Sequence, residues 1–398
     1  MIASENQSTL IASIGLLITN DLSWGSGPTG QLRDAWVVML DGRIESVGTG
    51  TPPPCDHVID AATRCVLPGF VDSHSHLVFD GDRAEEFASR MAGVPYAAGG
   101  IRTTVAATRA ATDEHLLARA TALRAESRRA GSTTLEIKSG YGLSVVDEAR
   151  TLAVAQLLST ETTFLGAHIV PPEFEGRADD YVSLVCKEML SACAPHAKWI
   201  DAFCETGAFD ADQSRAVLEA GRAAGLGLKL HANQLGHGPG VQLAVELGCA
   251  SADHCTYLSR ADIEALAGTA TLPGGATVAT FLPATDFSTR QPYPNARRLL
   301  DAGGIAALAA NCNPGSSFTT SMGFCIALGV RDLHMTIEEA IWAATAGGAA
   351  ALRRHDIGRI TPGARADLII LNTSQPIDFV YRPGTPLIAT TIVEGVIV

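Results

Sequence analysis

The sequence predicts an α/β fold, a (β/α)8 TIM-type barrel with a small β-sandwich domain built from both chain termini. Eight apolar strand-like segments alternate with helical segments through the middle of the chain. Both ends carry β-like patterns that the middle lacks, and histidines follow several of the expected strands. The carboxyl ends of barrel strands gather at one face, so these histidines are expected to lie together in an active site.

The small domain is expected to combine residues 1–63 and 359–398. Segments 10–18 and 35–48 have the composition of strands, and Asp41-Gly42 is a hairpin signal within the second of them. Strand-like segments recur close to the carboxyl end of the chain. One domain made from both ends therefore accounts for the β-rich termini.

The barrel is expected to occupy residues 64–358. Asp210 with Gln213, and Thr336 with Glu339, resemble capping boxes that start helices. A doubly wound open sheet is the alternative, but it needs a glycine-rich phosphate turn after the first strand, which this sequence lacks. The eight expected barrel strands are 66–71, 133–137, 162–167, 199–203, 227–230, 250–253, 277–282 and 305–310.

Composition narrows the class of protein. The 398 residues are 46% hydrophobic, enough for a large core, and the net charge of -13 disfavours nucleic acid or an anionic membrane as a partner. No apolar run reaches the roughly 18 residues of a membrane span, and the first residues do not resemble a signal peptide. The nine scattered cysteines include no CxxC pair. We therefore expect buried thiols and a cytoplasmic protein.

Two histidines with one residue between them are the centre of the candidate site. His74 and His76 follow an apolar run, and side chains two apart on a strand point to the same face. A pair of imidazoles on one face can bind a divalent metal, although an isolated HxH also arises by chance on surface turns. His168, His231 and His254 also follow expected strands, which favours a metal and its surroundings. The other histidines are expected to be solvated: His57, His115, His196, His237, His334 and His355.

Several sequence blocks resemble the amidohydrolase superfamily: PGFVDSHSH, the later HAN, the DH at 253–254 and GARADLIIL. Longer blocks are similar to the imidazolonepropionase family: HLVFDGDRAEEF, AAGGIRTTVAATRAA, LEIKSGYGL, TTFLGAH and NPGSSFTTSM. They span about residues 66 to 370. The resemblance implies hydrolysis of a small anionic cyclic amide, 4-imidazolone-5-propanoate, to N-formimidoyl-L-glutamate in histidine degradation. It also implies a homodimer.

The same resemblance assigns roles to individual residues. It implies one divalent metal, zinc or iron, held by His74, His76, His231 and residue 311, with His254 beside the attacking water. Without it, Arg83 would be read as a surface ion pair and the segment 313–315 as a turn. The implied substrate contacts are Arg83, which suits the propionate, with Tyr96, Tyr141, His168, Asn313, Gly315 and Ser316.

Two positions depart from the family pattern. Gln234 stands where the family commonly has a glutamate, and an amide cannot exchange a proton. Asn311 stands where the eighth strand usually ends in aspartate, so it can offer a neutral oxygen to a metal but cannot act as a base. Lys138 is expected to form hydrogen bonds rather than to bridge two metals. The alternatives are an amidohydrolase of a related imidazolone-type ring, or a weakly active or inactive ligand-binding relative.

Overall fold

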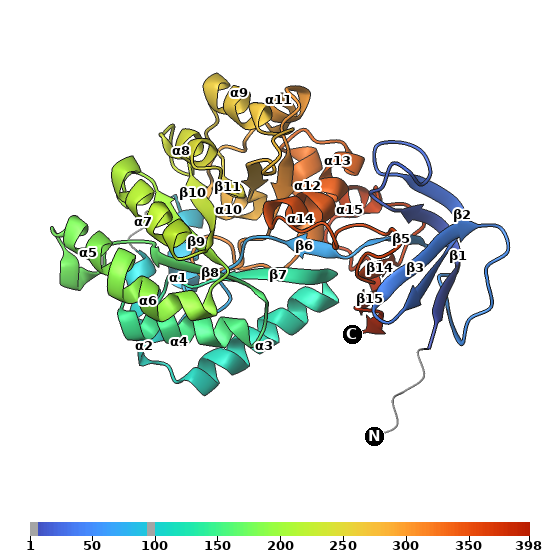
Figure 1. The fold of residues 1–398 in the computed structure, drawn as a ribbon, viewed down its shortest axis with the longest axis horizontal. Coiled ribbons are helices and arrows are strands. Elements are labelled where there is room, and N and C mark those ends of the chain that lie inside the picture. The colour runs from blue at the N-terminus through green and yellow to red at the C-terminus, as the bar shows by residue number, and fades with distance from the viewer. Residues whose placement is uncertain (1–6, 94–99) are drawn as a thin grey trace.

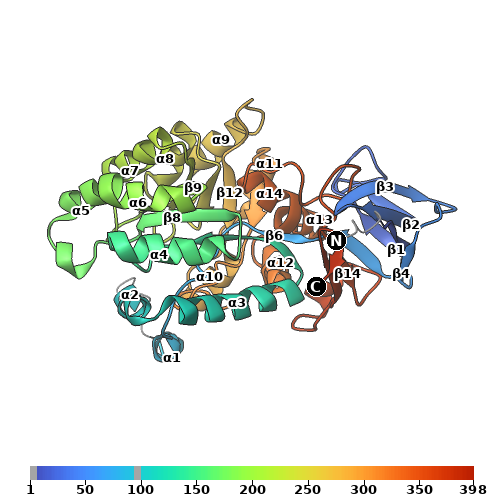
Figure 2. The ribbon, with the colours of Figure 1, turned by 60° about the horizontal axis from the view of Figure 1, so that its bottom comes forward.

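The computed structural model describes residues 7–93 and 100–398 and confirms the expected fold class (Figure 1). Eight parallel strands form a nearly closed barrel, and the two ends of the chain build a second, mixed sheet of eight strands. Figures 1 and 2 show the small sheet at one end of the molecule and the barrel at the other.

The barrel strands follow one another in sequence order around the barrel. Nearly every residue in them is buried, as expected for parallel strands that are covered on both faces. They are β6 (Phe70–Asp72), β7 (Ser132–Lys138), β8 (Glu161–Ala167), β9 (Trp199–Cys204), β10 (Gly227–Ala232), β11 (Ser251–His254), β12 (Val278–Phe281) and β13 (Ala306–Leu308).

Hydrogen bonds close the barrel between its first and last strands, immediately beside the HxH pair. The backbone N–H of Ala310 donates to Asp72 Oδ1 at 3.0 Å, and the N–H of Asn311 donates to the carbonyl of His74 at 3.0 Å. The N–H of His76 donates to the carbonyl of Cys312 at 2.9 Å. These bonds fix the segment after β6 against the segment after β13.

Helices cover the outside of the barrel (Figure 2). The expected capping boxes are confirmed at Asp210 and Thr336, and a third, which the sequence reading did not identify, lies at Ser259. The α-helices are α1 (Ala84–Met91), α2 (Ile101–Ala110), α3 (Asp113–Arg129), α4 (Val145–Gln156), α5 (Ala178–Leu184), α6 (Leu190–Cys193), α7 (Ala211–Ala223), α8 (Gly240–Glu246), α9 (Arg260–Gly268), α10 (Pro283–Thr289), α11 (Ala296–Asp301), α12 (Met322–Arg331), α13 (Ile337–Trp342), α14 (Gly348–Ala351) and α15 (Asp378–Tyr381).

The small sheet curls back on itself around a core of its own. The N–H of Ile44 donates to the carbonyl of Ala364 at 2.8 Å, which joins one edge of the sheet to the segment before its carboxyl-terminal strands. Asp41 and Gly42 form the expected hairpin turn, both with positive φ. The strands are β1 (Thr9–Ile18), β2 (Gln31–Leu40), β3 (Arg43–Thr49), β4 (His57–Asp60), β5 (Cys65–Pro68), β14 (Leu368–Leu371), β15 (Ile388–Val393) and β16 (Val396–Ile397).

The first expected barrel strand, 66–71, is wrong as a single strand, because the chain divides it between the two sheets. β5 pairs antiparallel with β14, with Val66 opposite Ile370, whereas β6 pairs with β7. Gly69 lies between them, and a Cβ there would come within 2.2 Å of Cγ2 of Thr133. Only glycine fits this close approach, so the chain passes from the small sheet into the barrel at this residue.

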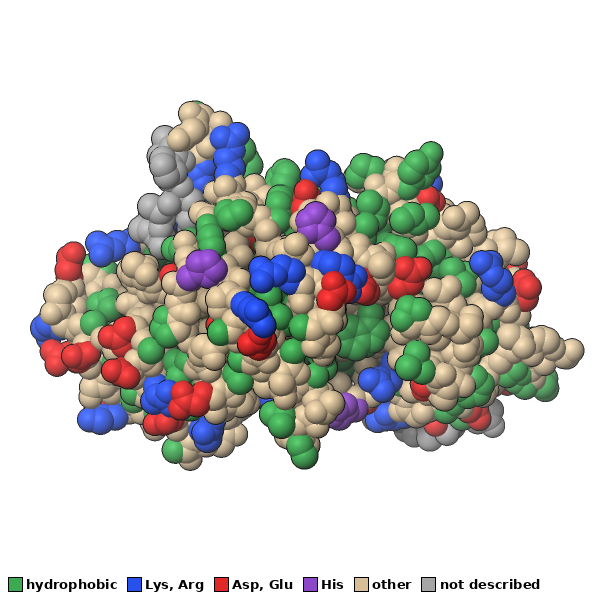
Figure 3. All heavy atoms as spheres, turned by 90° about the horizontal axis from the view of Figure 1, so that it is seen from above, with side chains coloured by type: hydrophobic (Ala, Val, Ile, Leu, Met, Phe, Trp, Pro, Cys, Tyr) green, Lys and Arg blue, Asp and Glu red, His purple; other side chains and the backbone are tan. Residues whose placement is uncertain are grey.

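The described residues contain no helix that is both long and apolar enough to cross a membrane. All nine cysteines are free thiols, and seven of them are buried. The face drawn in Figure 3 carries acidic and basic side chains interspersed with apolar ones. The strong net negative charge is therefore not gathered into one patch on that face.

Candidate metal centre

Three buried histidines lie close together at the carboxyl ends of the barrel strands. His74 and His76 follow β6, and His231 lies in β10; the ring centroids of His74 are 5.2 Å from His76 and 4.5 Å from His231. Nε2 of His74 and Nε2 of His76 are 3.3 Å apart. One nitrogen from each of the three rings lies within 4.8 Å of the others, so together they could hold a metal ion.

Two carboxylates fix the orientation of two of these rings. Nδ1 of His74 lies 2.7 Å from Asp253 Oδ2, and Nδ1 of His231 lies 2.9 Å from Asp201 Oδ2. A proton on each Nδ1 then leaves Nε2 with its lone pair, which is the arrangement found around bound metals. Burial lowers the pKa of His74 and of His76 well below 6.5, so both rings are neutral, as metal ligation requires.

Asn311 offers a fourth donor atom. It follows β13 with a φ of 52°, and its Nδ2 donates to Thr285 Oγ1 at 2.8 Å. Its Oδ1 is buried and has no hydrogen-bond partner within the described part of the chain. A neutral amide oxygen is a ligand that a divalent metal accepts. The three imidazoles and this oxygen therefore form a donor set that fits such an ion.

His254 lies beside the three histidines in a strained backbone conformation. Its ring centroid is 5.4 Å from that of His231 and 5.8 Å from that of His74. Its φ of 78° is rare for a residue with a side chain, and strain of this kind gathers at functional sites. Burial, and then the neighbouring His231, lower its pKa well below 6.5. The ring is therefore neutral, and its buried Nδ1 has no hydrogen-bond partner among the described residues.

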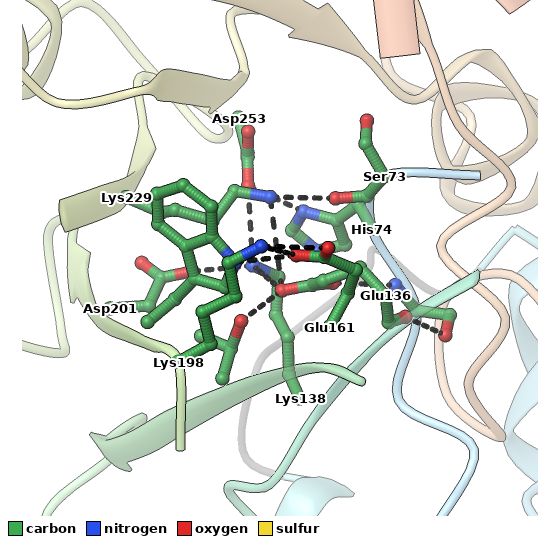
Figure 4. Close-up of polar contacts among 12 residues, drawn as sticks. Ser73, His74, Glu136, Lys138, Glu161, Lys198, Asp201, Lys229 and Asp253 are labelled. Atoms are coloured by element: carbon green, nitrogen blue, oxygen red, sulfur yellow. Dashed lines mark hydrogen bonds and ion pairs between the residues drawn. The ribbon is translucent and has the colours of Figure 1, made fainter. Parts of the chain in front are cut away.

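A buried network of carboxylates and lysines lies next to His74 (Figure 4). Nζ of Lys138 is 2.8 Å from Asp201, 2.9 Å from Glu136 and 3.4 Å from Asp253. Nζ of Lys229 donates to the backbone carbonyl of Ser73 at 2.7 Å. Lys138 thus makes the hydrogen bonds expected of it, and Lys229 holds the start of the HxH segment.

The charges in this network keep one another ionised. Burial alone would raise the pKa of Asp201, but His231 and Lys138 hold it below the ordinary range. Lys229 and Lys138 likewise outweigh burial at Asp253, whose pKa is also lowered. The histidine ligands therefore rest on ionised carboxylates, which raise the electron density that an imidazole can give to a metal.

The sequence reading did not assign roles to Glu136, Asp201 and Lys229. The signal was present, because fully buried charges are rare unless they are paired, and these charges interrupt apolar strands. Lys229 also stands two residues before His231, so both side chains lie on the same face of β10. A charged residue two positions before a strand-end histidine could therefore have been recognised as a supporting residue.

A single cavity brings most of the sequence-predicted substrate residues beside these histidines. Arg83, Tyr141, His168, Asn313 and Ser316 all line it, and so does Gln234. The ring of His168 stacks on His76 with centroids 5.4 Å apart, and its Nδ1 is 2.9 Å from the carbonyl of Gly140. Burial, and then His231, lower the pKa of His168 to about 3. Its Nδ1 therefore donates to that carbonyl, and Nε2 is left as an acceptor.

Arg83 reaches the cavity while it is held by a neighbouring carboxylate. Its Nε and Nη2 each lie 2.7 Å from an oxygen of Glu86, and only 6% of its side chain is exposed. Gly315 packs against it, because a Cβ at Gly315 would come within 2.0 Å of Arg83 Nη1. Gly100 packs against its other terminal nitrogen, so Glu86 and two glycines help to place the guanidinium at the cavity. Tyr96 lies outside the described residues.

Asn313 organises the loop that follows β13. Its Oδ1 accepts hydrogen bonds from the N–H of Gly315 at 2.9 Å and of Ser316 at 2.8 Å. Its Nδ2 donates to the carbonyl of Asn311 at 2.7 Å. The side chain therefore builds a tight turn and braces the residue that offers the fourth donor atom.

Known proteins show strong similarity over the whole chain. The sequence profile of the amidohydrolase family matches residues 65–398. The imidazolonepropionase of Salinispora arenicola is 63% identical over 390 residues, with 98% of each chain covered. That of Mycolicibacterium smegmatis is 61% identical, with 98% of this chain and 97% of the relative covered.

Solved structures share the fold at much lower identity. A variant of the atrazine chlorohydrolase of Arthrobacter aurescens, complexed with zinc and atraton, superposes with a TM-score of 0.71 at 18% identity, covering 98% of this chain and 94% of the other. A guanine deaminase from C. acetobutylicum gives a TM-score of 0.68 at 14% identity, covering 98% and 100%. The chain therefore belongs to the amidohydrolase family and, within it, to the imidazolonepropionases.

Proposed function

We propose that this protein hydrolyses 4-imidazolone-5-propanoate to N-formimidoyl-L-glutamate with the help of one divalent metal, zinc or iron. The observation that carries the proposal is the meeting of five strand-end histidines with Arg83 and the Asn313 loop, in a chain 63% identical to an imidazolonepropionase. The expected homodimer derives from the family resemblance and is tested by light scattering of the purified protein.

His74, His76 and His231 would hold the metal together with Oδ1 of Asn311. When bound, a divalent metal polarises an amide carbonyl and makes water a nucleophile near neutral pH. Asp253 and Asp201 keep two of the rings in the tautomer that ligation needs. The chain thereby supplies a rigid site before any substrate enters.

His254 is the candidate for proton transfer. Hydrolysis adds water across the ring carbonyl and breaks the adjacent C–N bond, so the water loses a proton and the departing nitrogen gains one. The neutral His254 can take the first proton and return it to the nitrogen. Gln234 and Asn311 can only form hydrogen bonds, because neither side chain exchanges a proton near neutral pH.

The substrate's propionate would pair with Arg83. Its guanidinium already forms two hydrogen bonds to Glu86, so the substrate carboxylate would share or displace that partner. His168 presents Nε2 as an acceptor for a ring N–H, and Tyr141 lies beside it with centroids 5.6 Å apart. One end of the cavity would then bind the anion while the other binds the ring.

A catalytically weak ligand-binding protein is the second candidate, favoured by Asn311. This residue adds no carboxylate to the metal site, and its amide is already bound to Thr285. The cavity and Arg83 would be unaffected by this loss. Substrate binding would thus persist while turnover fell.

Three measurements on one preparation separate these functions: metal per subunit by mass spectrometry, the initial rate with imidazolone propionate, and calorimetric binding of the same substrate. One equivalent of zinc or iron together with turnover supports the hydrolase. One equivalent of metal and saturable binding without turnover supports the second candidate. The variant His74→Ala/His76→Ala is the control, and a full equivalent of metal in it would show that the site is misplaced.

A further inference from the structure

We propose that a second cavity, between the barrel and the small sheet, binds a small oxyanion of the phosphate or sulfate class. Its volume is about 260 Å³, and its walls come from α3, the start of β7, the segment before β8, and three residues of the carboxyl-terminal part of the chain. It lies where β7 and β8 begin, whereas the histidines lie where barrel strands end. Nothing in the proposed hydrolysis uses this cavity.

Two arginines in its wall have no counter-charge among the residues that the structure describes. Arg124 and Arg128 lie one turn apart on α3, and both are partly buried. Neither guanidinium forms an ion pair or a hydrogen bond with any residue in 7–93 or 100–398. Burial, and then the positive charge of Arg128, lower the pKa of Arg124. Like charges four residues apart destabilise a helix, and partial burial adds to that cost.

Two serines add unused hydrogen-bond donors to the same wall. Ser127 is 1% exposed and Ser132 is 3% exposed, and both line the cavity. Neither hydroxyl oxygen has a hydrogen-bond partner in the structure as described. Buried hydroxyls are rarely left unpaired, and phosphate or sulfate oxygens accept hydrogen bonds from serine and arginine alike.

The remaining charges of the wall keep it positive. Arg365 ion-pairs with Asp367 and lies 3.8 Å from Glu394, whose side chain is 65% exposed. Asp367 neutralises Arg365. Arg124 and Arg128 therefore face one carboxylate of the wall, Glu394, and the wall keeps a net positive charge. In a chain with a net charge of -13, a pocket of this sign selects an anion over a cation.

The size of the cavity suits a hydrated oxyanion. A water molecule occupies about 30 Å³ of liquid, so 260 Å³ leaves room for a four-oxygen anion and several waters. The ligand would touch the barrel through α3 and the small sheet through Arg365. Because it binds the folded form alone, it would raise the stability of the whole chain.

The test titrates the full-length protein with phosphate or with sulfate at constant ionic strength, with chloride as the balancing ion. Calorimetry and Tm are both followed, after EDTA treatment so that a metal at the histidines cannot bind the anion. We expect a saturable heat and a saturable rise in Tm. The double variant Arg124→Gln/Arg128→Gln should weaken binding at least tenfold.

Arg129→Gln is the matched control, because Arg129 is exposed on the same helix and does not line the cavity. It should bind the anion as the parent does. Ser132→Ala is a milder second variant and should weaken binding several-fold. Binding that does not saturate, or that is equal in the parent and the folded double variant, overturns the proposal.

Discussion

Asn311 is the residue on which the proposed hydrolysis depends most. The family resemblance implies an aspartate at this position, after the last barrel strand. Asn311 lies at that position, between β13 and the Asn313 loop. Its backbone N–H still bonds His74, so the fold does not depend on the missing charge. Only the chemistry of the side chain differs.

Asn311→Asp is expected to raise kcat by up to about 10²–10⁴-fold, because it restores a base beside the bound water. Metal affinity should rise as well, since an anionic oxygen is a better ligand than a neutral amide. The measurements are initial rate and metal per subunit in both forms. Equal rates would show that His254 already acts as the base.

Thr285→Val is expected to weaken metal binding about 10–100-fold, because the hydroxyl that holds Nδ2 of Asn311 is lost and Oδ1 is no longer fixed. Thr285→Ser keeps the hydroxyl and is the matched control. A chelator-competition titration measures the affinity without reference to activity. If the valine and serine variants bind metal equally well, Thr285 does not orient the amide.

Asp286 is expected to make stability depend on pH. Burial raises its pKa to about 8, from an ordinary value of 3.8, and within residues 7–93 and 100–398 its side chain accepts a hydrogen bond only from Thr256 Oγ1, at 3.0 Å. Between these values the folded chain keeps a proton that the unfolded chain has lost. Raising the pH from about 4 to about 8 therefore lowers the free energy of unfolding, by at most about 1.4 kcal/mol per pH unit.

Asp286→Asn removes this titration. Urea unfolding at pH 5, 6.5 and 8 measures the free energy of unfolding of the parent and of the variant. As the pH rises, the variant should become more stable relative to the parent. A difference that stays constant over this range would mean that Asp286 is ionised in the folded protein.

At the scale of the element, the sequence predicted strands and helix starts that depend on neighbouring residues. It did not predict features that depend on pairing with distant segments. Seven barrel strands and two capping boxes follow from apolar runs and from polar residues three apart. The division of 66–71 could not be predicted, because both halves are equally apolar and β14, the partner of β5, lies 300 residues away.

The same distinction explains the site. Strand-end histidines could be placed at one face from the barrel alone, because every strand ends there. The pairing of Lys138 with Asp201 joins β7 to β9 and depends on the register of the intervening strand β8. The register of β8 against β7 and β9 cannot be predicted from the sequence pattern.

Lys138→Met is expected to destabilise the fold by about 3–5 kcal/mol, because three buried carboxylates lose their shared counter-charge. Urea unfolding measures the change. Lys198→Met is the control: Lys198 is 42% exposed, and its partner Glu161 also binds Arg354, so the cost should be about 1 kcal/mol or less. Similar losses in both variants would show that the buried network does not stabilise the fold.

At the scale of the whole molecule, the candidate metal ligands connect β10 with the place where the first and last barrel strands, β6 and β13, meet. They come from β10 and from the segments that follow β6 and β13. Binding at this point would stabilise the folded chain and leave the unfolded chain unaffected.

Removal of the metal should therefore lower Tm and abolish turnover together. At free metal 1,000-fold above Kd, binding contributes about 4 kcal/mol to stability. Calorimetry with and without EDTA measures the loss, and the Tm of His74→Ala/His76→Ala should not respond to EDTA. A parent Tm that is equally insensitive would show that the metal is absent or bound elsewhere.

The passage of the chain at Gly69 also has a consequence for synthesis on the ribosome. Strand β5 emerges early, but the strand that pairs with its free edge, β14, begins at residue 368. The small sheet therefore stays open at that edge while the entire barrel is made and folds. An mRNA truncated before the codon for residue 368 would give a chain that lacks β14. Its barrel would be joined to an incomplete sheet, and the unpaired backbone groups of β5 would promote aggregation.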